Sequence, residues 1–124
     1  MSQTRFAESH EWVRLDGDVA VVGISDHAQN ALGDVVFVDL PEVGRVVTAG
    51  EAVAVVESVK AASDVYAPIT GKIVEVNSAL VDDPAKINVE PTGEGWFFRI
   101  ELDGALPGDL LDADAYAAYV DTLA

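Results

Sequence analysis

Short runs of alternating apolar and polar residues, separated by glycine and proline, predict a chain built mainly of β-strands. Residues 11–24 predict a hairpin with Asp16-Gly17 at its turn, because an Asp-Gly pair between two apolar runs is a strong turn signal. Further strands are expected at 34–40, 51–58, 64–68, 71–77 and 95–102. Many short strands at regular spacing favour a small sandwich or flattened barrel.

Helical signals are confined to three places. Ser25 or Asp26 can cap a short helix in which Gln29 completes a capping box, and Gly33 suits the position after its end. Residues 82–88 hold at most one helical turn, begun near Pro84. Near the C-terminus, apolar residues recur every four positions and predict an amphipathic helix. These residues are Leu111, Ala115, Tyr119 and Leu123.

Length and charge narrow the class of protein. At 124 residues the chain is expected to form a single domain spanning 1–124. A formal net charge of −15 argues against nucleic acid or an anionic membrane as a partner. No apolar run approaches the roughly 18 residues of a membrane-spanning helix. The first residues, "MSQTRFAESHEW", have neither a secretory nor a transit character. A cytoplasmic protein is therefore expected.

The absence of cysteine excludes disulfides, thiolate metal sites and thiol nucleophiles within the chain. Any sulfur chemistry must therefore come from a cofactor. Other catalytic patterns are weak. Ser25 and His27 invite a hydrolase hypothesis, but no nucleophile-elbow motif accompanies them, so helix capping is the better interpretation of Ser25. His10 and His27 are too few for a usual zinc site without cysteine.

Lys60 stands apart in the stretch "VVESVKAASD". It is one of only three lysines in a chain with 22 acidic residues, and small residues follow it. Residues 49–57 and 70–77 are weakly similar to each other, and two such β-halves would place Lys60 at the tip of a hairpin. An exposed amine on a stiff base is what the attachment of a swinging arm requires. An ordinary solvated turn lysine is the alternative.

Several segments, in order, resemble the glycine cleavage system H proteins. The segment "VVESVKAASDVYAPITGKIVEVN" is similar to the lipoyl-attachment region of that family almost residue for residue. The resemblance continues in "SHEWVR", "VAVVGISDHAQNALGDVVFVDLPEVG", "GEGW" and "DLLDADAYAAYV", and it covers roughly residues 6–120. Thr92 and the run 88–90 depart from the family pattern, which puts partner contacts of that loop in question.

The resemblance implies a mainly β fold, a barrel-sandwich hybrid of the biotinyl/lipoyl-carrier type, with a short helix in the N-terminal half and a C-terminal helix. It implies a carrier rather than an enzyme, with (R)-lipoic acid in amide linkage on Lys60. The implied partners are glycine decarboxylase (P-protein), aminomethyltransferase (T-protein), dihydrolipoamide dehydrogenase (L-protein) and a lipoylating enzyme. The implied task is to shuttle the aminomethyl group of glycine from the P-protein to the T-protein, followed by reoxidation by the L-protein.

Three further residues receive a role from the resemblance. Family members lay their arm on the protein surface near positions that match Ser9, Glu11 and Asp64 in this chain. Ordinary surface acids are the alternative for Glu11 and Asp64. Two other functions stay open: a relay that donates lipoyl to 2-oxo acid dehydrogenase complexes, and a small hydrolase built on Ser25 and His27.

Overall fold

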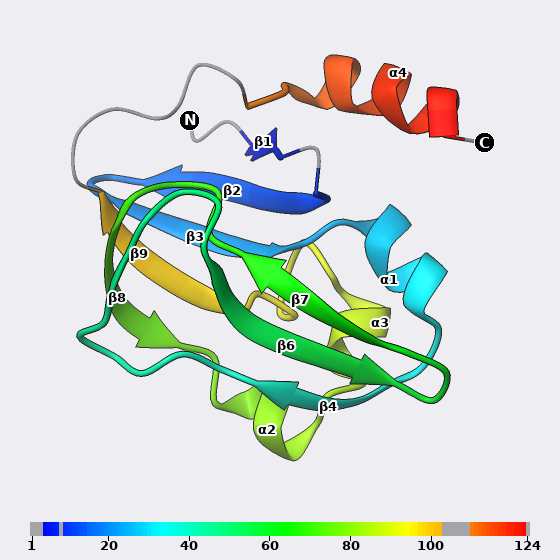
Figure 1. The fold of residues 1–124 in the computed structure, drawn as a ribbon, viewed down its shortest axis with the longest axis horizontal. Helices are drawn as coiled ribbons and strands as arrows, with labels where there is room; N and C mark the ends of the chain where they lie inside the picture. The colour runs from blue at the N-terminus through cyan, green and yellow to red at the C-terminus, as the bar shows by residue number, and fades with distance from the viewer. Residues whose placement is uncertain (1–3, 8, 103–109, 124) are drawn as a thin grey trace.

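Two antiparallel sheets form the body of the protein in the computed structural model, which describes residues 4–7, 9–102 and 110–123 (Figure 1). The larger sheet contains, in spatial order, β1 (Thr4–Phe6), β2 (Glu11–Asp16), β3 (Val19–Ile24), β9 (Phe98–Leu102), β8 (Gly71–Val76) and β5 (Val46–Val47). The smaller sheet contains β4 (Val35–Asp39), β6 (Ala52–Ser58) and β7 (Ala62–Tyr66). The expected mainly β, sandwich-like fold is confirmed.

Most strands fall where the sequence predicts them. The β2–β3 hairpin pairs Asp16 with Val19, and Gly17 adopts a φ of 66° in the turn between them. Only glycine enters this left-handed region without steric cost. The sequence did not indicate β1 and β5, because two or three residues are too few to show an alternating pattern.

Apolar side chains from both sheets share one core. Trp12, Phe97 and Phe98 are fully buried in the structure. Phe37 is an exception, because half of its surface is exposed. The pairing of β4 with β6 is irregular between Val35 and Phe37, and such a bulge turns successive side chains out of simple alternation.

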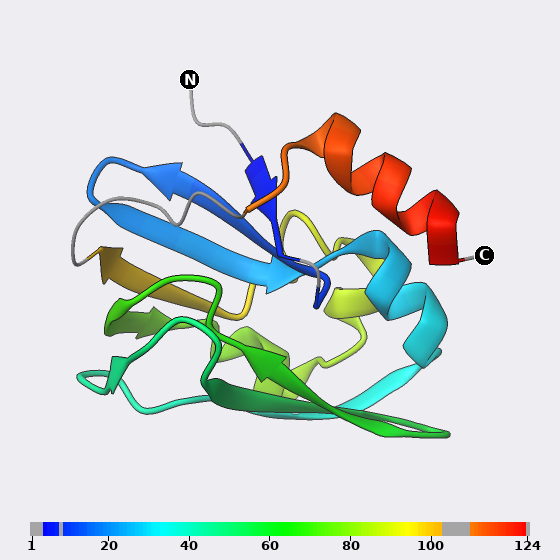
Figure 2. The same cartoon turned by 45° about the horizontal axis from the view of Figure 1, so that its top comes forward.

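The helices lie around the sheets (Figure 2). They are α1 (Asp26–Leu32), α2 (Ala79–Asp82), α3 (Lys86–Val89) and α4 (Ala113–Leu123). The Ser25 hydroxyl caps α1 by accepting the N–H of Ala28 at 3.1 Å, and Gly33 follows the helix with a φ of 81°. The single turn near Pro84 is α3, whereas α2 had no clear signal in the sequence.

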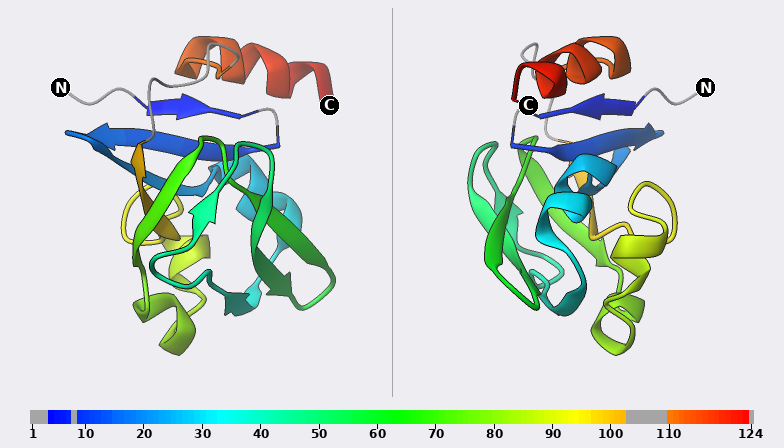
Figure 3. Two further views of the ribbon diagram at one scale, coloured as in Figure 1. Left: turned by 60° about the vertical axis from the view of Figure 1, so that its left-hand side comes forward. Right: turned by 90° about the vertical axis from the view of Figure 1, so that its right-hand side faces the viewer.

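Helix α4 lies over β1 and β2 (Figure 3). Tyr116 of this helix is buried, and its ring stacks on Phe6 with centroids 4.3 Å apart. The repeat of four predicted a face containing Ala115, which is exposed. Tyr119 of the same predicted face is half-buried, so the prediction is right at Tyr119 and wrong at Ala115, since 3.6 residues per turn shift a four-residue repeat around the helix.

Strands β6 and β7 form the hairpin that the sequence predicted around Lys60. The last pair of the ladder is Glu57 with Ala62, and the tip projects at the edge of the molecule (Figures 1 and 2). The two weakly similar segments do not pair with each other. Strand β6 belongs to the smaller sheet and β8 to the larger one.

Candidate functional site

Lys60 is exposed at the tip of the β6–β7 hairpin. The turn is closed by backbone and side-chain bonds of Ser58: its N–H donates to the carbonyl of Ala61 at 2.7 Å, and its hydroxyl oxygen accepts the N–H of Ala61 at 3.1 Å. The neighbour Val59 is 69% exposed. The amine therefore stands on a short, hydrogen-bonded turn and is accessible to another protein.

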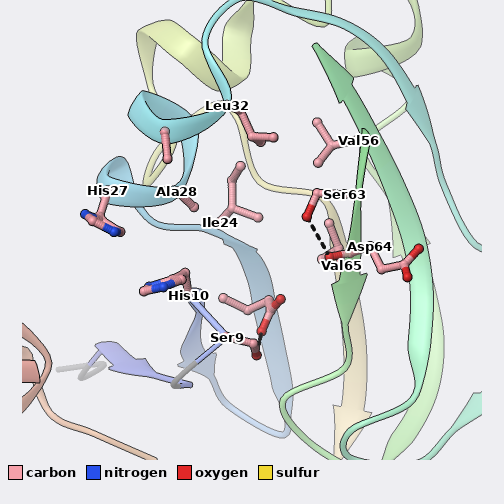
Figure 4. A pocket seen from close by; sticks show the side chains of 12 residues that line it. Ser9, His10, Ile24, His27, Ala28, Leu32, Val56, Ser63, Asp64 and Val65 are labelled. Atoms are coloured by element: carbon pink, nitrogen blue, oxygen red, sulfur yellow. Dashed lines mark hydrogen bonds between the residues drawn. The ribbon is translucent and has the colours of Figure 1, made fainter. Parts of the chain in front are cut away.

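A pocket of about 230 Å³ lies between this hairpin, α1 and the start of β2 (Figure 4). Its polar lining consists of Ser9, His10, Glu11, His27, Ser63 and Asp64. Its apolar lining consists of Ile24, Ala28, Ala31, Leu32, Val56 and Val65. The volume is below the ~300 Å³ at which pockets for small molecules usually begin, so a narrow chain suits it better than a bulky ligand.

The structure brings to this pocket the three residues expected to dock the arm, Ser9, Glu11 and Asp64, together with His10 and His27. Lys60 is outside its lining, at the tip of the same hairpin. The apolar wall supplied by Ala28 and Leu32 was not anticipated. The pattern predicted the helix, but which of its faces turns toward the hairpin depends on tertiary packing.

Glu11 is a buried carboxylate rather than the surface acid that the sequence left as the alternative. Only 2% of its surface is exposed. One carboxylate oxygen accepts the Ser9 hydroxyl and the other accepts the backbone N–H of Tyr66 at 3.2 Å. Since Glu11 begins β2 and Tyr66 ends β7, this side chain joins the two sheets. Burial raises the pKa of Glu11 above its ordinary value, and the bonds from Ser9 and Tyr66 partly oppose that rise.

Asp64 is placed differently. Along β7 the side chains alternate, so Ser63 and Val65 lie on one side of the strand and the Asp64 carboxylate on the other (Figure 4). Asp64 is exposed and pairs with Val55 in the hairpin. The two acids therefore do not converge: Glu11 is at the buried base of the pocket, and Asp64 is at its rim.

A polar cluster adjoins the pocket beneath α4. The Tyr116 hydroxyl lies 2.7 Å from His10 Nδ1 and 2.6 Å from Ser25 Oγ, and the rings of His10 and His27 are 4.8 Å apart. Burial, and after it the neighbouring His27, lower the pKa of His10. Ser25 serves as the cap of α1 and as a partner of Tyr116. The capping interpretation of Ser25 is confirmed.

Replacing Glu11 with glutamine is expected to stabilise the protein at neutral pH. Folding raises the pKa of this carboxyl, so its protonated form stabilises the folded state. That contribution is fully present below the pKa of the unfolded chain, near 4.5, and is lost as the pH rises through the pKa of the folded state. Glutamine stays neutral, can accept the Tyr66 N–H and can donate to Ser9. Urea unfolding of both proteins between pH 4 and 8 measures this.

The advantage of Glu11→Gln should shrink toward zero as the pH falls below the ordinary range of a glutamate. A difference that stays constant across the pH series would contradict a raised pKa for Glu11. Glu11→Ala is the matched comparison. It leaves the Tyr66 N–H without its acceptor, which typically costs about 1–3 kcal/mol of stability.

Two other features are absent from the part of the chain that the structure describes. No group of three or more His, Asp or Glu side chains there is arranged to hold a metal ion. None of the helices in residues 4–7, 9–102 and 110–123 is long and apolar enough to span a membrane.

Comparisons with known proteins agree along nearly the whole chain. The family model described as "Glycine cleavage H-protein" matches residues 4–123. A glycine cleavage system H protein from Acidiphilium cryptum is 64% identical, over 99% of this chain and 100% of its own length. One from Thermotoga maritima is 56% identical, over 96% of this chain and 97% of its own. The crystal structure of a glycine cleavage system H protein from Mycobacterium marinum superposes with a TM-score of 0.89 at 44% identity, covering 96% of this chain and 97% of that one.

Proposed function

Because the chain belongs to the glycine cleavage H-protein family, a family of lipoyl carriers rather than enzymes, we propose that it carries (R)-lipoic acid in amide linkage on Lys60. In this role it shuttles the aminomethyl group of glycine from the P-protein to the T-protein, and the L-protein reoxidises it. Residues 1–124 act as a single carrier domain in the cytoplasm. The observation that carries the proposal is the position of Lys60, an exposed amine at the tip of a stiff hairpin.

The residues around Lys60 fit an acylated lysine. Ala61 and Ala62 are small and exposed, so a lipoylating enzyme can close over the amine without a steric obstacle. Lipoic acid supplies a pair of thiols on a long arm, and the chain itself has no cysteine. The protein's own contribution is therefore presentation, shelter and partner recognition.

The pocket beside the hairpin is the proposed docking site for the arm. Asp64 is four residues from Lys60, so the two positions are at most roughly 13 Å apart at about 3.3 Å per residue. A lysine extended by a lipoyl chain spans a similar length at about 1.2 Å per bond. Ser9 and Glu11 offer polar groups at the base, and Asp64 lies at the rim with its carboxylate on the other side of β7. Ala28 and Leu32 exclude water from one side.

A reconstituted assay tests the proposed function. The lipoylated chain is combined with purified P-, T- and L-proteins, glycine, tetrahydrofolate and NAD⁺, and the formation of NADH is followed. We expect activity that depends on the lipoylated chain and saturates with its concentration. The unlipoylated chain is the control and should support none. If NADH forms no faster with the lipoylated chain than without it, the carrier role is excluded.

The relay hypothesis differs in its acceptor and can be measured separately. The lipoylated chain is mixed with the lipoyl-accepting domain of a 2-oxo acid dehydrogenase complex and a lipoyl-transferring enzyme. Intact mass then shows which protein holds the lipoyl group. If the chain is a relay, the acceptor gains the mass of a lipoyl group and this chain loses it. If the chain serves only glycine cleavage, it keeps its lipoyl group.

A further inference from the structure

The side chain of Asn88 connects α3 to the segment that links α1 to β4. Its amide nitrogen donates to the carbonyl of Gly33 at 2.8 Å and to the side-chain oxygen of Gln29 at 3.0 Å. Its oxygen accepts the N–H of Val35 at 2.9 Å. Gly33 and Val35 lie on either side of Asp34, so one half-buried side chain holds both ends of this short link.

The link in turn contacts the hairpin tip that carries Lys60. The carbonyl of Asp34 accepts the N–H of Val59 at 3.0 Å. The stem of Lys60 lies against Gly33, since a Cβ added at Gly33 would be 3.3 Å from Cε and 3.9 Å from Nζ of the lysine. Both Val59 and Lys60 therefore rest on the segment that Asn88 holds.

Other contacts near the tip are within the hairpin and with β4, where Val35 pairs with Ser58. The bonds of Ser58 close the turn but join the hairpin only to itself. The pairing between β4 and β6 is irregular just after Val35, so the regular ladder does not extend without interruption to the tip. Both amide hydrogens and the oxygen of Asn88 are in use. Removing this side chain frees the Gly33 carbonyl and the Val35 N–H together.

We propose that Asn88 is a positioning residue for the modification of Lys60. It fixes the link of residues 33–35, and this link orients Val59 and the lysine stem for an enzyme that acylates a primary amine and recognises the shape around it. The enzymatic part rests on the proposed function, namely that Lys60 is lipoylated. The structural part, that Asn88 orders the tip, does not depend on it.

Hydrogen exchange of the Val59 amide tests the structural part. The proteins are wild type, Asn88→Ala, Asn88→Asp and the neighbouring Val89→Ala, whose side chain is 76% exposed in wild type. Aspartate keeps the acceptor for Val35 but cannot donate to Gly33 when ionised. Exchange at Val59 should be about 2- to 10-fold faster in Asn88→Ala, the effect of one typical hydrogen bond, and intermediate in Asn88→Asp. Val89→Ala should match wild type.

Lipoylation kinetics test the enzymatic part, with a lipoate ligase, lipoate and ATP acting on each unmodified protein. The chemistry at Nζ is unchanged, so kcat should stay at the wild-type value. KM should rise, because the enzyme recognises one orientation of the tip and the variant populates that orientation less. The expected rise for Asn88→Ala is again about 2- to 10-fold. Ile87→Val is the stability control, because truncating this fully buried residue of the same helix costs about 0.5–1.5 kcal/mol and removes none of the hydrogen bonds of Asn88.

The outcomes separate the two proposals. If wild type itself gains no lipoyl group, the proposed function fails, and Val59 exchange still decides whether Asn88 orders the tip. If wild type is lipoylated and the Asn88 variants keep its KM, Asn88 has no role in recognition. An equal rise of KM in Ile87→Val would assign the effect to general destabilisation and overturn the inference. If Asn88→Ala does not fold, comparing the KM of Asn88→Asp with that of Ile87→Val gives the same decision.

Discussion

Lys60→Arg is expected to remain unmodified when it is incubated with a lipoate ligase, lipoate and ATP, whereas wild type gains the mass of one lipoyl group. Arginine keeps the positive charge and much of the length of lysine. Its delocalised guanidinium stays protonated and does not act as the amine nucleophile that forms an amide bond. Intact-mass spectrometry before and after incubation measures the result directly. The expected loss is complete rather than partial.

The other two lysines are the matched controls. Lys72 lies within β8, between its partners Val46 and Glu101, and Lys86 begins α3. Neither lies at a hairpin tip, so Lys72→Arg and Lys86→Arg should be lipoylated as wild type is. Because Lys60 is exposed, Lys60→Arg should change the free energy of unfolding by no more than about 0.5 kcal/mol. A folded Lys60→Arg protein that still gains lipoyl mass would falsify the assignment.

Gly71→Ala is expected to lower the free energy of unfolding by about 3 kcal/mol or more, although it adds a single methyl group. Gly71 begins β8, where it is buried and pairs with Val47 on one side and Leu102 on the other. A Cβ at this position would lie 2.5 Å from Cγ2 of Ile100 and still closer to the carbonyl oxygen of Glu101. A backbone carbonyl in a ladder has no room to move, so β8 and β9 must separate.

Gly93→Ala is the control for this substitution. A Cβ there would meet only the side chain of Glu90, at 3.4 Å from Oε1, and the far end of a glutamate can move aside. Its unfolding free energy should stay within about 1 kcal/mol of the wild-type value, the usual intrinsic difference between glycine and alanine. Urea unfolding of the three proteins measures both effects. Equal midpoints for Gly71→Ala and wild type would show that the strands tolerate the methyl group.

Local signals in the sequence were enough to define most elements. The Asp16-Gly17 pair predicted the β2–β3 turn, and Ser25 with Gly33 bounded α1, because turn and cap chemistry involve neighbouring residues only. The short strand β1 and the helix α2 left no such signal. The hairpin around Lys60 was predicted from the weak similarity of residues 49–57 and 70–77, but the strand that pairs with β6 is β7 rather than β8.

By itself, the sequence determined the mainly β class, the hairpin around Lys60 and, through resemblance, the family. The tertiary structure decided what the side chains of these elements do. It buries Glu11 between the sheets, turns Asp64 outward and leaves Phe37 half exposed, and it ties Asn88 to the link beside Lys60. The physical reason is separation along the chain. Glu11 and Tyr66 are 55 residues apart, as are Gly33 and Asn88, so no local pattern encodes contacts that only packing creates.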